Sequence, residues 1–290
     1  MTGLVQEFTH RNSRLLPSEC GNPNVLRPRI IGGYEPLMGS VPWVARLGFR
    51  RLADPPCTLS VAFLCGGALI SSRYVITAAG CVAKRERAIS AVLVLVRLGE
   101  HDDETNPDCR ETVCNLPHED YFVEDINVHR KFDPVHLYND LALVRVNRTI
   151  IFTDFIRPIC MPTAYLSTDN GELNKVAFSG WGANHPKKQN TVLTWFTLLT
   201  LNQSFCESAY KTKSYEYKMS PGQLCAYPKC GGALCKGDTG GPLQMVDNDT
   251  NLHHLVGVAS YTRSCTCLTY PALFTQVYHY LTWIFDQMKP

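Results

Sequence analysis

From Ile30 onward the chain consists of short β-branched and aromatic runs that are broken by glycine, proline, asparagine and aspartate. Each run has the length of a β-strand, and the residues between the runs are typical of turns. Examples are residues 43–49, 68–70, 74–77, 92–98, 141–146, 176–179, 255–259 and 272–277. Many short strands with frequent turns predict an all-β protein, either a barrel or a sandwich.

The end of the chain departs from this pattern. Apolar residues recur there at offsets of 0, 3, 4, 7, 8 and 11 from Val277. This spacing places them on one face of a helix. We therefore expect a helix over 277–288 that packs on the core and has a structural role only.

Residues 1–29 are polar and contain three prolines, several arginines and one cysteine, Cys20. We interpret them as an extended tether, followed by one large unit over residues 30–290. A length of 290 residues fits either two domain-sized units or one larger all-β unit. We see no internal repeat and no low-complexity segment.

Charge and hydropathy argue against two classes of partner. The formal net charge is +2, so the chain has no strong basic field of the kind that binds nucleic acid. Its longest apolar run, residues 91–96, is far shorter than the roughly 18 to 20 residues of a membrane-spanning helix. We expect neither a nucleic-acid partner nor a membrane partner.

Thirteen cysteines are many for a cytosolic enzyme and typical of an oxidising compartment. Residues 1–19, however, lack the apolar core of about 7 to 15 residues that a secretory signal requires. We resolve this conflict by interpreting the protein as extracellular and the sequence as incomplete at its amino terminus. A longer parent chain would then precede Met1.

Six short segments occur in an order that carries a family resemblance. They are Arg29-Ile-Ile-Gly-Gly (29–33), Cys65-Gly-Gly-Ala-Leu-Ile (65–70), Thr77-Ala-Ala-Gly-Cys (77–81), Asn139-Asp-Leu-Ala-Leu (139–143), Ser179-Gly-Trp-Gly (179–182) and Lys236-Gly-Asp-Thr-Gly-Gly-Pro (236–242). Together they resemble the chymotrypsin-like (S1) serine proteases, from Ile30 to about Trp283. The resemblance implies two antiparallel six-stranded β-barrels, over about 30–150 and 151–275, with the C-terminal helix at 277–288.

The catalytic mechanism of that family needs a nucleophilic hydroxyl, an imidazole that takes its proton, and a buried carboxylate that orients the imidazole. By resemblance, the corresponding positions are Thr239 for the hydroxyl, Gly80 for the imidazole and Asp140 for the carboxylate, with Gly237 in the oxyanion segment. Glycine offers no proton acceptor, and an unassisted threonine hydroxyl is a poor nucleophile near neutral pH. The resemblance therefore implies a protease fold without useful peptidase activity.

Other histidines do not occupy the place of the missing base. Those considered are His101, His118, His129 and His136, and none lies in the segment that presents the base. The buried carboxylate of Asp140 must then be hydrated, accept a hydrogen bond from Ser260, or have a raised pKa. We expect water to lie beside Gly80, an expectation that an apolar side chain packed there would contradict.

Arg29 and Ile30 resemble the activation bond of the family, which a trypsin-like protease cuts after the arginine. The freed Ile30 ammonium would pair with Asp238 and order the loop that surrounds it. A buried pair of this kind is stable only with good geometry and complete hydrogen bonding. In the competing interpretation, residues 30–33 only begin a strand and Asp238 only occupies a turn.

The substrate-pocket positions also depart from the family pattern. They are Ala233 at the base, Ser260, Tyr261 and Thr262 along one wall, and Ala272 on another. A trypsin-like pocket carries an aspartate at the base and glycines on the walls. We therefore expect the added Cβ atoms to narrow this slot, with no carboxylate to bind a basic side chain.

The resemblance also pairs most of the cysteines. The family-type bridges are Cys65–Cys81, Cys206–Cys225, Cys235–Cys265 and Cys20–Cys160, the last of which would hold the tether. Two further candidates are Cys109–Cys114, which looks like a feature of arthropod clip-domain proteases, and Cys230–Cys267. A zinc site built from the four cysteines between 230 and 267 is disfavoured because its spacing is unlike common zinc ribbons. Cys57 is left over, either free or bonded to a partner chain.

Three further features are candidate sites of modification or binding. Asn147, Asn202 and Asn248 begin N-glycosylation sequons. Glu100, Asp102 and Asp120 are candidate ligands of a structural calcium ion in a loop that resembles a calcium loop of the family, although a solvated acidic loop is the alternative. The basic clusters 84–87 and 187–188 are interpreted as exposed loops, with binding to heparin-like or microbial surfaces as the alternative.

The resemblance to clip-domain homologues implies a secreted, non-catalytic cofactor or regulator in an extracellular cascade, such as those of melanisation and innate immunity. Its partners would be an activating trypsin-like protease and a cascade protease or the substrate of that protease. One alternative is a weak S1 endopeptidase that uses Thr239. Another is a module that binds microbial or matrix polysaccharide, for which the sequence shows no clear aromatic or basic groove. The longer parent chain expected before Met1 would carry a clip domain or a signal peptide.

Overall fold

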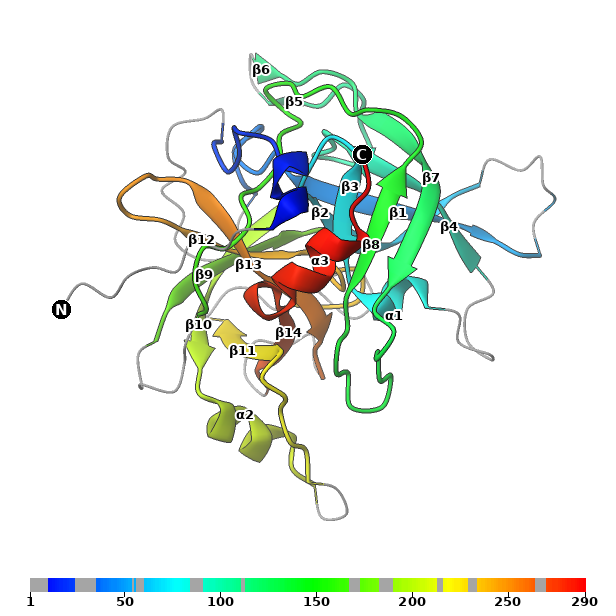
Figure 1. Cartoon of the computed structure of the whole chain (residues 1–290). Coiled ribbons are helices and arrows are strands. Elements are labelled where there is room, and N and C mark those ends of the chain that lie inside the picture. Colours follow the sequence, from blue (N-terminus) through cyan, green and yellow to red (C-terminus); the bar gives the residue numbers. More distant parts are fainter. Residues whose placement is uncertain are drawn as a thin grey trace.

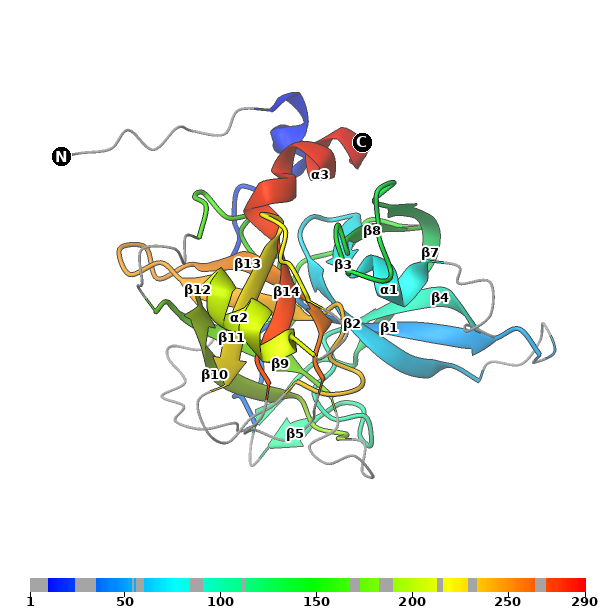
Figure 2. The same cartoon turned by 90° about the horizontal axis from the view of Figure 1, so that it is seen from below.

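A computed structural model describes residues 10–23, 35–53, 55, 60–83, 91–110, 113–166, 173–182, 190–212, 216–228, 234–263 and 270–290. Two closed antiparallel barrels of six strands each account for most of these residues, and they lie side by side (Figures 1 and 2). The predicted all-β fold with two six-stranded barrels is therefore confirmed.

The first barrel has the strand order β1-β2-β3-β8-β7-β4. Its strands are β1 (Val44–Arg51), β2 (Ala62–Leu69), β3 (Tyr74–Thr77), β4 (Ala91–Leu98), β7 (Glu119–Val128) and β8 (Ala142–Val146). The runs seen in the sequence supply its interior, where Leu47, Ile76 and Leu143 are fully buried. Burial of such apolar side chains is the main stabilising contribution to a barrel of this size.

The second barrel has the order β10-β11-β14-β13-β12-β9. Its strands are β9 (Lys175–Gly180), β10 (Thr194–Leu201), β11 (Gln223–Pro228), β12 (Pro242–Val246), β13 (His253–Tyr261) and β14 (Ala272–Gln276). Three phenylalanines pack in its core, with the ring of Phe178 centred 5.4 Å from that of Phe196 and 6.4 Å from that of Phe274. A small hairpin, β5 (Cys109–Arg110) and β6 (Val113–Cys114), lies outside both barrels.

The helices are short: α1 (Ala79–Val82), α2 (Gln203–Tyr210), the 3₁₀ helix η2 (Val277–Tyr280) and α3 (Leu281–Gln287). The helix expected over 277–288 is present, beginning as η2 and continuing as α3, and its apolar face is buried at Val277, Leu281 and Ile284. Helix α2 was not predicted. Within the described ranges, none of these helices is both long and apolar enough to cross a membrane.

The amino-terminal segment is docked, which corrects the expectation of a wholly extended tether. Residues Arg11–Leu15 form a 3₁₀ helix, η1, that lies against α3 on one side of the two barrels (Figures 1 and 2). The imidazole of His10 stacks on Phe285, and its Nε2 lies 3.2 Å from Asp286. A five-residue 3₁₀ helix has no periodic pattern in the sequence, so contacts with α3 must stabilise it.

Asn12 connects this segment to the end of the chain. Its Nδ2 group donates hydrogen bonds to the carbonyl oxygens of Phe285, at 2.9 Å, and Met288, at 3.1 Å. Both carbonyls lie at the C-terminal end of α3, where no further turn of helix supplies N–H donors, and the Phe285 carbonyl also accepts from Met288 N–H at 3.3 Å. The side chain of Asn12 therefore caps α3 from a distant part of the sequence.

Replacing Asn12 with alanine should lower the free energy of unfolding by about 1 to 2 kcal/mol, because two helix-end carbonyls each lose the hydrogen bond from its side chain. Urea denaturation followed by circular dichroism measures this change. Ser18→Ala, at an exposed residue of the same segment, is the matched control and should leave the midpoint unchanged. Equal midpoints for the two variants would show that the cap contributes nothing.

Four predicted disulfides are present: Cys20–Cys160, Cys65–Cys81, Cys109–Cys114 and Cys206–Cys225. Cys235 is also disulfide-bonded, and its expected partner Cys265 lies outside the described residues. Cys230, Cys267 and Cys57 also lie outside the described residues. The Cys235–Cys265 and Cys230–Cys267 pairings and the state of Cys57 therefore stay predictions. Next to Cys20, Gly21 donates its N–H to the carbonyl of Pro158 at 2.8 Å, so backbone pairing supports the bridge that holds the segment.

Candidate functional site

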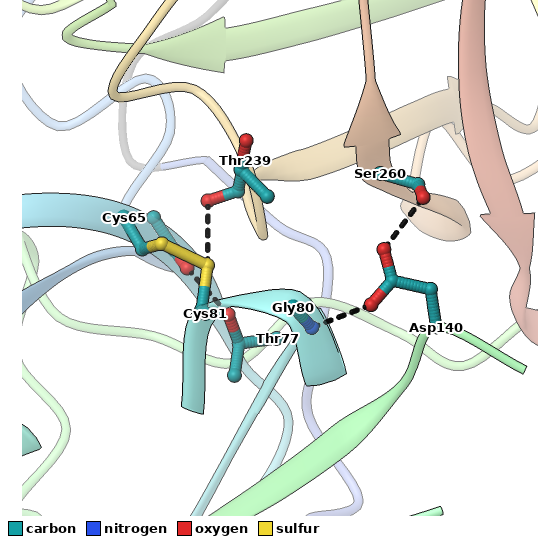
Figure 3. Close-up of a disulfide and its surroundings, with 8 residues drawn as sticks. Cys65, Thr77, Gly80, Cys81, Asp140, Thr239 and Ser260 are labelled. Carbon is teal, nitrogen blue, oxygen red and sulfur yellow. Dashed lines mark hydrogen bonds between the residues drawn. A yellow bond between two sulfur atoms is a disulfide. The ribbon is translucent and has the colours of Figure 1, made fainter. Parts of the chain in front are cut away.

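The triad-equivalent positions meet between the two barrels. Gly80 lies in α1, Asp140 lies two residues before β8, and Thr239 lies in the loop before β12 of the second barrel. The N–H of Gly66 in β2 donates to the carbonyl oxygen of Thr239 at 2.8 Å and fixes that loop against the first barrel. The structure therefore brings together the three positions that the motifs predicted (Figure 3).

Asp140 is 1% exposed and has hydrogen-bond donors on both carboxylate oxygens. Oδ1 accepts from the backbone N–H of Gly80 at 2.7 Å, and Oδ2 accepts from the hydroxyl of Ser260 at 2.5 Å (Figure 3). Of the three arrangements considered from the sequence, the hydrogen bond from Ser260 is thus present. The donor at Gly80 was not foreseen, because backbone groups leave no signal in a sequence motif.

The space beside Gly80 admits a side chain. A Cβ built on this glycine would lie 3.5 Å from Asp140 Oδ1, 3.8 Å from Oδ2 and 4.0 Å from Cγ, and these are its three nearest atoms. All three distances are ordinary van der Waals contacts. Among the described residues, the atoms nearest to this Cβ belong to Asp140 and not to an apolar side chain, and the expected water stays a prediction.

Thr239 is held by its backbone. Its carbonyl oxygen accepts from Gly66 and lies 3.5 Å from Cys81 Sγ of the Cys65–Cys81 disulfide (Figure 3). Gly237 and Gly240 on either side have φ angles of +104° and +86°, a region that glycine adopts readily. A Cβ on Gly240 would also collide with Thr77 Oγ1, so this position accepts only glycine.

No hydrogen bond between a histidine and Thr239 or Asp140 occurs among the described residues. His101 pairs with Glu35, His118 with Glu100, and His136 with Asp133, while His129 packs against Trp283. The imidazoles that the sequence offered as substitutes are therefore engaged elsewhere. Within the described chain the site holds a carboxylate and a hydroxyl but no base between them.

Asp238 is 3% exposed and lies in a pocket whose walls are glycines. Its Oδ1 accepts from Gly182 N–H and its Oδ2 from Cys235 N–H, both at 2.8 Å. Burial raises the pKa of this carboxyl to about 7, because both donors are neutral and leave the charge without a cation. No ion pair to Asp238 occurs in the described ranges, and its expected partner Ile30 lies outside them, as does Arg29.

An aromatic hollow of about 400 Å³ includes Tyr261, which directly follows Ser260, the hydrogen-bond partner of Asp140. It is lined by Pro134, Val135, Leu137, Tyr210, Tyr217, Tyr261 and Arg263. Val135 and Tyr261 are 74% and 42% exposed, so apolar surface faces solvent here. Sequence reasoning singled out only Tyr261 of this hollow, because the other residues come from separate segments without a shared motif.

Of the remaining substrate-pocket positions, Ser260 and Ala272 are buried, whereas Ala233 lies outside the described residues. The hydroxyl of Ser260 donates a hydrogen bond to Asp140. This side chain therefore orients the carboxylate, in addition to its predicted place in a wall of the substrate pocket. The expectation of a narrowed slot therefore stays a prediction.

The acidic residues proposed as calcium ligands are engaged with arginines. Arg97 makes two contacts with Asp120, at 2.8 and 3.0 Å, and one with Glu100, at 3.3 Å. Asp102 Oδ2 accepts from Arg110 Nη2 at 3.0 Å. In the part of the chain that is described, no three His, Cys, Asp or Glu side chains are grouped to hold a metal ion.

The three sequon asparagines, Asn147, Asn202 and Asn248, are all exposed. Asn202 also caps α2, since its Oδ1 accepts from Phe205 N–H at 2.9 Å. Exposure is compatible with a glycan at each position, and their modification stays a prediction. The basic clusters 84–87 and 187–188 lie outside the described residues.

Comparison with known proteins agrees with this geometry. The Trypsin family model matches residues 30–284. The chain is 36% identical over 274 residues to the Spaetzle-processing enzyme of Drosophila melanogaster, covering 90% of this chain and 67% of that protein. It is 30% identical over 287 residues to phenoloxidase-activating factor 1 of Holotrichia diomphalia, covering 97% and 75%. Among solved structures it resembles the Drosophila Grass clip serine protease of the Toll pathway, with a TM-score of 0.75 and 32% identity over 93% of this chain and 74% of that chain.

Proposed function

Because the chain belongs to the trypsin family and is homologous to arthropod clip-domain serine proteases, we propose that it is a protease homologue without catalytic activity. In this role it binds other proteins of an extracellular protease cascade and regulates them. The relatives support this setting, since they are named for processing Spaetzle, for activating phenoloxidase and for the Toll pathway.

The observation that carries the proposal is the absence of a side chain at Gly80. Proton transfer from the nucleophile needs a base within hydrogen-bond reach, and the backbone at this position supplies only a donor to Asp140. Loss of one member of the triad already removes several orders of magnitude of rate. The change to threonine at position 239 adds a methyl group next to the hydroxyl that would attack.

The aromatic hollow supports a role in binding. It keeps an exposed apolar surface next to a site that lacks its base, and exposed apolar surface of this kind is typical of interfaces. Arg263 at its edge would favour a partner segment that combines an apolar side chain with an acidic one. The bound partner would be a cascade protease or the substrate of that protease.

Cleavage after Arg29 is the proposed switch. In the intact chain the nitrogen of Ile30 is part of a peptide bond and has no charge, and cleavage turns it into an ammonium. Asp238 is the matching group, because its buried carboxylate accepts only neutral backbone donors among the described residues. The change would reorder the loop around Asp238 and so change binding, while the Cys20–Cys160 disulfide keeps the cleaved segment attached.

We expect the purified protein, cleaved after Arg29, to give no covalent labelling with a fluorophosphonate probe and no turnover of a peptide library. The same preparation should bind an active cascade protease, or its substrate, saturably, as measured by surface plasmon resonance. Thr239→Ala identifies any label that does form at that hydroxyl. Labelling that disappears in this variant, together with peptide turnover, would instead identify a threonine-dependent endopeptidase.

A variant at the aromatic hollow tests whether the partner binds there. Val135→Asp places a charge on the hollow and should weaken the saturable binding, whereas Val113→Asp, at a 57% exposed residue of the separate hairpin, should not. Equal affinity for both variants would place the interface elsewhere on the surface.

A further inference from the structure

Phe122 presents an aromatic ring on the outer face of the first barrel. It lies in β7 and is 62% exposed, whereas the preceding Tyr121 is fully buried in the core. Successive side chains of a strand point to opposite faces, so the exposed ring follows the buried one as the pleat requires. β7 lies beside β8, the strand that ends directly before Asn147 (Figure 1). The barrel therefore leaves a flat apolar surface open to solvent near the end of β8.

Asn147 lies directly opposite Phe122. The outermost pair of the β7–β8 ladder at this end is Val123 with Val146. One step further, the N–H of Asn147 donates to the carbonyl oxygen of Phe122 at 2.9 Å. Val146 is fully buried and Asn147 is exposed, so the side chain of Asn147 shares the outer face with the ring. Directly opposite residues of an antiparallel pair have Cβ atoms about 5 Å apart.

The sequon that Asn147 begins is open to a modifying enzyme. Asn147, Arg148 and Thr149 are all exposed. Within the described residues, neither the side-chain amide of Asn147 nor the hydroxyl of Thr149 makes a hydrogen bond. The guanidinium of Arg148 instead lies 4.1 Å from the ring centre of Tyr121, which holds the middle residue against the barrel. The two side chains that define the sequon are thus both available.

The other two sequons lack this arrangement. Asn202 is followed three residues later by an exposed aromatic residue, Phe205, but its side chain is fixed as the cap of α2. Asn248 lies in the turn between β12 and β13, and its neighbours in the chain are Asp247 and Asp249. Among the three, Asn147 alone combines an available amide with an exposed aromatic ring directly across a strand pair.

We propose that Asn147 carries an N-linked glycan whose first N-acetylglucosamine packs on the ring of Phe122. The donor is an oligosaccharide joined through pyrophosphate to a lipid carrier. The amide nitrogen forms a bond to the anomeric carbon of the sugar and loses one proton. The bond from that carbon to the pyrophosphate oxygen breaks, and the pyrophosphate leaves with the electron pair. The C–H face of the sugar then covers the exposed ring and removes apolar surface from water.

This site does not depend on cleavage after Arg29 and does not compete with the proposed binding role. Asn147 directly follows β8, whereas Asp140 and Leu137, the latter at the aromatic hollow, come before that strand. A glycan at Asn147 therefore lies at the opposite end of β8 from the hollow. The hollow stays open to a protein partner.

The test uses the full chain, secreted from cultured human cells that attach N-glycans. The folded protein is treated for increasing times with peptide N-glycosidase F, which cuts the bond between the asparagine and the first sugar, and glycopeptides are quantified by mass spectrometry. We expect Asn147 to be occupied. Release from Asn147 should be about two- to tenfold faster in Phe122→Ala, because the sugar loses its contact with the ring and is open to the enzyme. Phe122→Tyr keeps the ring and should match the wild-type rate.

Val113→Ala is the matched control, because Val113 is 57% exposed and lies on the hairpin outside both barrels. It should leave release from Asn147 unchanged, and Phe122→Ala should leave release from any glycan at Asn202 or Asn248 unchanged. An unmodified Asn147 in the secreted wild type overturns the site. An occupied Asn147 whose glycan leaves equally fast from the wild type and from Phe122→Ala overturns its contact with the ring.

Discussion

The double variant Gly80→His, Thr239→Ser, cleaved after Arg29, should react with a fluorophosphonate probe at least about a thousandfold faster than the parent chain. The two substitutions return the base and the less hindered hydroxyl to positions that the fold still holds in place. The probe is small and needs no substrate pocket, so the result does not depend on the slot around Ala233. In-gel fluorescence after timed labelling measures the rate.

The geometry around residue 80 explains why one substitution can restore the base. The three nearest described atoms to a Cβ at this position all belong to Asp140, at 3.5 Å or more, so the Cβ of a histidine meets ordinary contacts beside the carboxylate that would orient its ring. Asp140 already holds the orientation that the imidazole needs, because Ser260 and the Gly80 N–H fix its two oxygens. The labelling rate should rise with pH as the imidazole loses its proton, near pH 6.5 for an unperturbed histidine.

The matched control is the double variant Gly80→Gln, Thr239→Ser, which adds a side chain of similar size that cannot act as a base. Its labelling rate should stay near that of the parent chain. Adding Asp140→Asn to the active pair should remove most of the gain, because the imidazole then loses its orienting carboxylate. If the double variant folds, is cleaved after Arg29 and still does not label, the lost base is not what makes the parent chain inert. The proposal of a non-catalytic homologue would then need a different physical cause.

Features of this structure that depend on neighbouring residues in the sequence could be predicted from local motifs. The strand runs and the spacing at 277–288 predicted an all-β barrel or sandwich and the terminal helix. The two barrels and the positions of Gly80, Asp140 and Thr239 followed from the resemblance of six short segments to the S1 family. The contact between Ser260 and Asp140 was one of three alternatives, and only the fold distinguished them.

Features that depend on distant segments escaped prediction. The sequence shows the carboxylates of the acidic loop but not their pairing with Arg97 and Arg110, and a calcium ion in this loop stays a prediction. The docking of η1 depends on carbonyls at the far end of the chain, which Asn12 caps. The aromatic hollow needs Tyr210, Tyr217 and Tyr261 from three separate elements. In each case the missing information was which side chains meet across the fold.

The second large effect concerns Asp238 in the uncleaved chain, whose stability should fall as pH rises from about 4 to 7. The carboxyl has a pKa of about 7 in the folded protein against 3.8 as its ordinary value, so between these limits the folded state binds one proton more than the unfolded state. The free energy of unfolding then falls with pH at about 1.4 kcal/mol per unit, or about 4 kcal/mol over the window. Below pH 4 the Asp238 carboxyl is protonated in both the folded and the unfolded state, so the cost of burying its charge disappears.

Urea denaturation of the uncleaved wild type and of Asp238→Asn at pH 4, 5.5 and 7.5 tests this. The amide cannot ionise, so the difference in unfolding free energy, variant minus wild type, should grow by about 4 kcal/mol in favour of the variant from pH 4 to 7.5. The amide also leaves one of the two N–H donors facing an NH₂ group, which adds a constant offset but no pH dependence. Asp249→Asn, at an exposed position, should follow the wild type.

Cleavage after Arg29 should remove most of this dependence, because the Ile30 ammonium then supplies the cation that the buried carboxylate lacks among the described residues. A buried carboxylate is stable as an ion only with such a partner and with its hydrogen bonds satisfied, and the two N–H donors already satisfy part of that requirement. Cleaved wild type should therefore gain stability at pH 7.5 relative to the uncleaved chain, whereas Asp238→Asn should gain none. Parallel pH profiles for cleaved and uncleaved wild type would mean that the new terminus does not reach Asp238, and the binding role would have to operate without a proteolytic switch.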